Sequence, residues 1–153
     1  MSITVSTKFK ELILGPNSFG DIFNGGQMLL YSGIRPASPD QAAVSSPVAR
    51  VTNEGLAWLP NDVSGLQFTQ AGAWISKSDA QNWKLVGLAD SQVTWFRLYG
   101  NSELDVGGDS LDFARLDGDA SDLASADFVL PANTISASQI LVVQQFLYSL
   151  APL

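Results

Sequence analysis

The sequence predicts an all-β fold, an antiparallel sandwich or barrel of about eight strands with a short N-terminal helix. Short runs of alternating apolar and polar residues, rich in β-branched and aromatic side chains, recur along the chain. Gly, Pro, Asn and Asp separate these runs at intervals of about ten residues, a spacing typical of antiparallel strands rather than of a parallel α/β sheet. The 153 residues contain no internal repeat and no linker, so residues 1–153 are expected to form one domain.

Helical structure is expected near the N-terminus. Within residues 7–14, Phe9 and Leu12 lie at helical spacing, although an extended lead-in would fit the same residues. A second helix of one to two turns is expected after Ser18, whose side chain can accept a backbone hydrogen bond, with Asp21 near the positive helix start. The Asn-Gly-Gly run at 24–26 would end it, because both residue types accept left-handed backbone angles.

The remaining elements are expected to be strands. The run 92–99 is the clearest, because its residues alternate between two faces. The run 67–76 is expected to be a single strand with Gly72 as a bulge. In 139–150 the β-branched and aromatic residues favour a strand, and a helix capped at Ser138 is the alternative. The expected strands cover residues 27–33, 47–52, 57–59, 67–76, 82–89, 92–99, 111–116, 127–130 and 139–150.

The composition limits the chemistry that the protein can perform. The chain has no Cys and no His, which removes the commonest general base, thiol nucleophiles, zinc sites and disulfides. Its net charge is −7 and its eight basic residues are scattered singly, which argues against nucleic acid or an anionic membrane as the main partner. No signal peptide and no membrane-spanning run is recognisable, so we expect a protein made in the cytoplasm that does not enter a membrane.

No arrangement of residues in the sequence points to catalysis. A serine nucleophile would need a Gly-x-Ser-x-Gly turn or a neighbouring base, and Ser76 beside Lys77 has no supporting motif. The carboxylate pair of a glycosidase is missing as well, because Glu11 and Glu54 lie in no recognisable setting. We therefore expect a protein that is not an enzyme, with no catalytic residue and no cofactor.

Acidic residues gather in one segment of the chain. Eight of the fifteen lie between residues 103 and 127, with Arg115 as the only base among them. Asp117, Asp119 and Asp122 place oxygens at spacings that a Ca²⁺ loop uses, but an EF-hand would need Gly where Asp122 stands and a bidentate Glu six residues later. Solvated turns or a salt-bridging face are the main expectation, and a Ca²⁺ site is the alternative. No metal ligand is assigned.

Four tryptophans lie within residues 58–95. Trp83 and Trp95 lie on expected strands, so we expect them in the core or at its edge. Trp58 and Trp74 are expected to be partly exposed, where they would suit either a protein–protein contact or a stacking platform for a carbohydrate.

Both ends of the chain are apolar. The tail 147–153 follows a long stretch without charge, since no charged residue comes after Asp127. A free tail of this kind would promote non-specific association, so it is expected either to pair into a sheet or to dock on a neighbouring subunit. Residues 1–14 are expected to form an arm that reaches a neighbour in the same way. The predicted interface residues are Phe9, Leu12, Trp58, Trp74, Leu150 and Leu153.

Three stretches of the sequence share an order and spacing with a known family: 18–26 with 28–33 and 35–43, then 95–100, and then 114–118 with 127–130 and Ile135. Taken together, they resemble a family of small structural proteins of tailed bacteriophages and prophages. In that family a helix leads to a YSG-x-x-P-x-x-x-D turn, a WFR strand follows, and an R-x-DG turn precedes the last strands. The similarity extends from about residue 12 to residue 146.

The resemblance implies a non-enzymatic virion protein, and in particular a capsid decoration protein that stabilises the head lattice. Such a protein would bind the major capsid protein or other virion subunits through its ends and an apolar patch, as a homo-oligomer. A head–tail connector, a collar or a tail-tip component is the alternative within the virion. A carbohydrate-binding adhesion module that uses Trp58 and Trp74 is the alternative from another class of protein.

Overall fold

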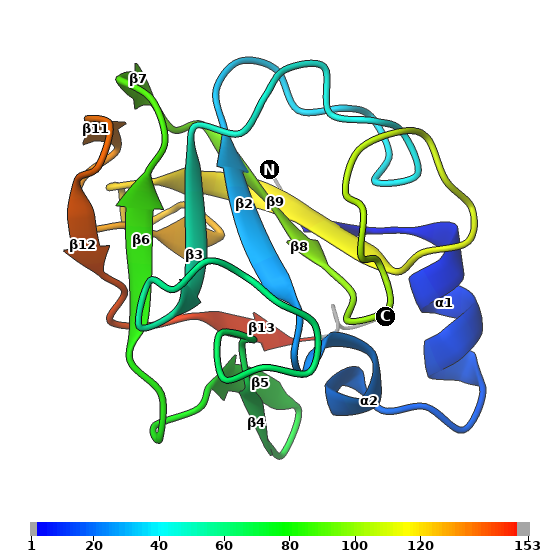
Figure 1. Ribbon diagram of the computed structural model, residues 1–153. Coiled ribbons are helices and arrows are strands. Elements are labelled where there is room, and N and C mark those ends of the chain that lie inside the picture. Colours follow the sequence, from blue (N-terminus) through cyan, green and yellow to red (C-terminus); the bar gives the residue numbers. More distant parts are fainter. Residues whose placement is uncertain (1–2, 150–153) are drawn as a thin grey trace.

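The computed structural model describes residues 3–149 and confirms the all-β fold (Figure 1). The strands form three sheets of eight, three and two strands, and almost all neighbouring strands are antiparallel. The structure also contains two short helices. The large sheet curls, but its end strands are not hydrogen bonded to each other, so the described residues form no closed barrel. Neither of the helices within 3–149 has the length and apolar character that crossing a membrane would require.

The large sheet runs in the order β1-β9-β8-β2-β3-β6-β12. Its eighth strand, β10, lies parallel to β9, and this is the one exception to antiparallel pairing among the described strands. The expected strand 92–99 corresponds to β8, in which every residue is buried. The strands of this sheet are β1 (Thr4–Val5), β2 (Gln27–Tyr31), β3 (Ala49–Asn53), β6 (Trp83–Gly87), β8 (Trp95–Tyr99), β9 (Arg115–Ser121), β10 (Phe128–Val129) and β12 (Ile140–Val142).

The three-stranded sheet has the order β13-β5-β4 and projects at the lower edge of Figure 1. Its strands are β4 (Phe68–Ala71), β5 (Trp74–Lys77) and β13 (Leu147–Ser149), while β7 (Ser91–Gln92) and β11 (Thr134–Ile135) form the two-stranded sheet. The single strand expected over 67–76 is wrong, because the chain reverses at Gly72 and Ala71 pairs with Trp74. Gly72 has φ +60°, which a two-residue hairpin turn of this kind requires at its first central position.

The structure has two helices: the short N-terminal helix of the predicted fold class and the second helix predicted after Ser18. In α1 (Thr7–Leu14) the Ser6 side chain accepts a hydrogen bond from the backbone N–H of Phe9. In α2 (Phe19–Phe23) Ser18 accepts from the backbone N–H of Asp21, as predicted, and the Asp21 side chain in turn accepts from the backbone N–H of Ser18, which completes a capping box. The buried face of each helix is aromatic, and the ring centroids of Phe9 and Phe23 lie 5.5 Å apart.

The main core lies inside the curl of the large sheet and continues beneath the helices. Phe146 stands at its centre and contacts the rings of Phe68, Trp83, Phe96 and Phe128 at centroid distances between 5.6 and 6.0 Å. It belongs to the segment that links β12 to β13, so this connection crosses the core instead of passing over the surface. The expectation that Trp83 and Trp95 are buried is confirmed.

Three further strand predictions differ from the structure. Residues 57–59 form a loop, not a strand. The strand expected at 111–116 begins later, as β9, and Leu111 is exposed. The described part of the run 139–150 contains strands and no helix, as the β-branched residues predicted, but it divides into β12 and β13.

Candidate functional site

A second buried cluster lies on the outer face of the large sheet, away from the main core. Arg97 on β8 makes a bidentate ion pair with Asp117 on β9, with N–O distances of 2.7 and 2.8 Å, and both side chains are fully buried. Its third nitrogen donates to the carbonyl oxygen of Gln41 at 2.8 Å. Burial alone would lower the pKa of Arg97, but the hydrogen bonds and the charge of Asp117 outweigh burial and raise that pKa. Arg97 therefore remains a cation.

Arg115 makes the second ion pair of this cluster. It binds both carboxylate oxygens of Glu103, at 3.0 and 2.7 Å, and both side chains are almost completely buried. Its remaining N–H groups donate to the backbone carbonyls of Pro39, Gly107 and Gly108. Because one guanidinium reaches two loops, it holds residues 32–48 and 100–114 against the sheet.

Aromatic rings fill the space between the two ion pairs. Tyr31 stacks on Trp95 at a centroid distance of 4.4 Å, and its hydroxyl group is 2.6 Å from that of Tyr99. Burial raises the pKa of Tyr31 and that of Tyr99 above the ordinary value. Arg97 lies 5.5 Å from the Trp95 ring centroid, within cation–π range. Each charged group of this cluster is thus paired with another group of the same chain. The cluster therefore holds the loops in place and leaves no charge available to a ligand.

The sequence predicted solvated turns or a salt-bridging face for these acids, and Glu103 and Asp117 do form ion pairs, but in a buried cluster that the sequence did not reveal. Most of the segment with Ca²⁺-like spacing lies in strand β9, and Asp117 within it is fully buried against Arg97. Among residues 3–149, no group of three or more acidic side chains is placed to hold a metal ion. Arg97, within the otherwise apolar strand β8, was the available signal, because a buried guanidinium requires a carboxylate partner.

The three-stranded sheet presents an uncharged surface, which we name the hairpin face. Its two principal side chains are Trp74, which is 53% exposed, and Leu147, which is 41% exposed. The strand register places them on the same side, because Trp74 pairs with Ser149 and Ser76 pairs with Leu147. The hairpin face consists of Thr69, Ala71, Trp74, Ser76, Leu147 and Ser149.

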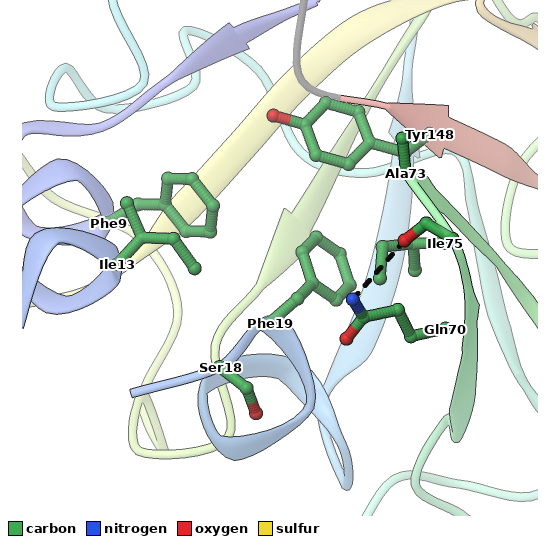
Figure 2. Close-up of a pocket in the computed structure, with 9 residues that line it drawn as sticks. Phe9, Ile13, Ser18, Phe19, Gln70, Ala73, Ile75 and Tyr148 are labelled. Carbon is green, nitrogen blue, oxygen red and sulfur yellow. Dashed lines mark hydrogen bonds between the residues drawn. The ribbon is translucent and has the colours of Figure 1, made fainter. Parts of the chain in front are cut away.

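The opposite side of the same sheet lines an apolar pocket of about 350 Å³ (Figure 2). Phe9 and Ile13 come from α1 and Phe19 from α2, and they point toward Ile75 and Tyr148 on the sheet. Gln70 lies at the rim, where its side-chain nitrogen donates to the carbonyl oxygen of Gly72 at 3.3 Å. Burial raises the pKa of Tyr148, so this side chain is neutral at physiological pH. The pocket offers apolar contact and no acid or base for catalysis.

Two of the predicted interface residues lie in or beside the apolar pocket, but they are not free to contact a partner. Phe9 is only 1% exposed and packs against Phe19, so the prediction that it lies on a free arm is corrected. Leu12 is partly buried against the same core. The physical reason is that α1 lays its apolar side on its own chain. Leu150 and Leu153 lie outside the described residues.

The two tryptophans expected to be partly exposed are both so, but their environments differ. Trp74 is 53% exposed on the hairpin face. Trp58 has intermediate burial, and its indole N–H donates to the carbonyl oxygen of Gly25 at 2.9 Å. That bond ties the loop between β3 and β4 to the end of α2. No strand pairing or pocket among the described residues joins the two, so they do not form one platform.

The hairpin face is therefore the surface of residues 3–149 that best fits a binding role, and it retains one of the predicted residues, Trp74. The buried cluster, by contrast, positions loops, and Trp58 fastens another loop. Comparison of the chain with known protein families, with curated protein sequences and with solved structures gives no match.

Proposed function

We propose that the protein is a non-enzymatic structural subunit of a tailed-phage virion, and specifically a decoration protein that binds the head lattice through its hairpin face. The observation that carries the proposal is the exposure of Trp74 and Leu147 at diagonal positions on one side of a sheet, among residues without charge. Exposed apolar groups that gather on one surface are typical of protein–protein contacts, and tryptophan is the side chain most enriched at their energetic centres.

The distribution of charge supports the same proposal. The chain carries a net charge of −7, yet the six residues of the hairpin face are uncharged. A contact made by this face avoids the cost of removing ionised groups from water. The acidic remainder of the surface would then face solvent and keep particles apart by repulsion.

Rigidity is the second property that suits a lattice subunit. The two longest loops over the large sheet are held by Arg97 and Arg115 through backbone carbonyls, and Trp58 holds a third. A preorganised subunit loses little conformational entropy when it binds, so more of the contact energy is available to stabilise the lattice. The resemblance to phage structural proteins agrees with this role.

The first experiment counts copies of the protein in purified virions by quantitative mass spectrometry, with the major capsid protein as the internal standard. A decoration protein should be present on the order of hundreds of copies, as symmetric occupation of a head lattice requires. About 3 to 12 copies would move the protein to the connector, collar or tail tip. Its absence from particles would overturn the virion proposal.

The second experiment tests the hairpin face itself. Trp74→Glu places a charge at the centre of the face and should reduce binding to undecorated heads by at least about 100-fold, which corresponds to the loss of an interface hot spot. Val44→Glu is the matched control, because Val44 is 81% exposed in the loop between β2 and β3. Figure 1 shows this loop at the top of the molecule, while the three-stranded sheet lies at the bottom. Equal binding by both variants would exclude the hairpin face as the contact.

A carbohydrate-binding role is the second candidate, and one observation favours it. Trp74 is 53% exposed on the central strand of the three-stranded sheet, on the same side as Ser76 and Ser149, and an exposed indole ring with hydroxyl groups nearby suits a sugar ring. A glycan ligand should quench tryptophan fluorescence in the natural protein and not in Trp74→Ala. No quenching across a broad glycan array would exclude this role.

A further inference from the structure

Strand β12 forms an edge of the large sheet, and the orientation of its backbone groups follows from its hydrogen bonds. β12 pairs with β6, and no other described strand pairs with it. The C=O of Gln139 accepts from Gly87 at 2.8 Å and the N–H of Val143 donates to Trp83 at 2.9 Å, so odd-numbered residues direct their backbone groups toward β6. The N–H and C=O groups of Ile140 and Val142 therefore point to the free edge.

This edge strand is short, with three residues, but it lacks the charged side chains and Pro that protect many edge strands from pairing. Proteins shield an exposed edge with a short strand, charged side chains, Pro, a bulge or a covering element. Residues 139–145 contain no charge and no Pro, and Ile140 and Val142 are 62% and 43% exposed. The edge of β4 is different, because the N–H of Phe68 donates to the side chain of Asn24 at 2.8 Å.

We propose that β12 is a self-association edge, at which β12 of one copy pairs antiparallel with β12 of a second copy about a two-fold axis at Leu141. This proposal names the contact within the homo-oligomer but does not depend on the virion role. The register would place Ile140 of one copy opposite Val142 of the other. Because both residues point their N–H and C=O groups outward, each such pair would exchange two backbone hydrogen bonds. Their side chains would meet on the outer face of a continuous sheet.

Charge is the reason to assign a second copy as the occupant. A two-fold contact brings identical surfaces together, so any charge at its centre faces itself. With a net charge of −7, two copies can approach closely only through an uncharged surface, and β12 provides one. The nearest charged neighbour on its outer face is Lys84 opposite Val142, and Lys84 is already paired with Glu54 at 3.0 Å. The contact surface is thus neutral without any external ion.

Sedimentation equilibrium of the natural protein, up to about 1 mM, tests the proposal, because a short edge contact belongs to the weak class of interfaces. Val142→Pro removes one outward N–H and leaves the hydrogen bonds to β6 intact, as edge positions allow. We expect a reversible dimer for the natural protein and a monomer for this variant. Val142→Thr is the matched control, which keeps the N–H and a β-branched side chain and should remain dimeric.

A second measurement keeps the proposal testable if the proline variant folds poorly. Amide exchange by NMR should show that the N–H groups of Ile140 and Val142 become protected as the protein concentration rises, while their neighbours in β6 stay protected throughout. A natural protein that remains monomeric at about 1 mM, or a dimer whose Ile140 and Val142 amides exchange as fast as in the monomer, would overturn the proposal. Either result would leave the virion role to be decided by the particle experiments.

Discussion

Removing the charge of Asp117 tests whether the buried ion pair holds the outer face of the sheet together. Asp117→Asn preserves the shape of the side chain but leaves the guanidinium of Arg97 without a counter-ion in a site that is fully buried. One of the two bonds, at 2.7 and 2.8 Å, would face an amide nitrogen that cannot accept it. Breaking a buried pair by removing one partner costs about 3–5 kcal/mol, against a total stability of about 5–15 kcal/mol for a domain.

The assay is urea unfolding followed by tryptophan fluorescence, with Trp95 as a local reporter because it stacks on Tyr31 beside the pair. Arg97→Met and the double variant complete a double-mutant cycle. The double variant should be more stable than the sum of the single losses predicts, by about 1–3 kcal/mol, because no unpaired charge remains. A loss below about 1 kcal/mol for Asp117→Asn, or strictly additive losses, would show that the pair is solvated or unimportant.

Further predictions concern the tyrosines, one glycine and one helix cap. All three tyrosines are buried with a raised pKa, so the unfolded chain releases their protons at a lower pH than the folded protein does; stability should therefore fall as pH rises above the ordinary tyrosine value of about 10, and tyrosinate absorbance should appear at a higher pH in the folded protein than in the unfolded chain. Gradual tyrosinate formation in the folded protein near pH 10 would contradict this. Gly87→Ala places a Cβ atom 2.0 Å from the carbonyl oxygen of Ser136 and should lower Tm by roughly 6–12 °C, for a loss of about 3 kcal/mol; calorimetry showing an unchanged Tm would refute the close approach. Ser18→Ala removes the capping box with Asp21 and should cost about 1 kcal/mol in chemical unfolding, whereas a loss near zero would mean that α2 is held by its aromatic face alone.

Patterns that are local in the chain predicted the fold well. The alternation over 92–99 and the capping residue Ser18 are read from neighbouring residues, and the structure contains β8 and α2 at these places. Local patterns failed at Gly72, because a strand bulge and a two-residue hairpin turn use glycine for the same backbone freedom. Only the pairing of Ala71 with Trp74 distinguishes the two, and that pairing depends on the fold.

The candidate site was less predictable, because its determinants are long-range. A solvated turn or a salt-bridging face was expected for Asp117 in its acidic stretch, but burial of the pair was not, because its partner Arg97 lies 20 residues away on the neighbouring strand. The apolar residue Phe9 looked available for a partner, but α1 turns it toward the core of its own chain. The partial exposure of Trp58 and Trp74 was predicted correctly, because a tryptophan next to a turn has few neighbours that could cover it.

The pairing of β1 with β9 has a consequence for the order in which the chain can fold. Thr4 pairs with Asp117, so β1 has no partner until β9 has been synthesised. Arg97 likewise cannot form its ion pair before Asp117 has been synthesised, and the main core cannot be completed before Phe146 has been synthesised. Domains with such distant pairings fold slowly and expose apolar surface in the meantime. Synthesis at low temperature or with added chaperones should therefore raise the yield of native protein, and truncation before residue 117 should leave a chain that aggregates.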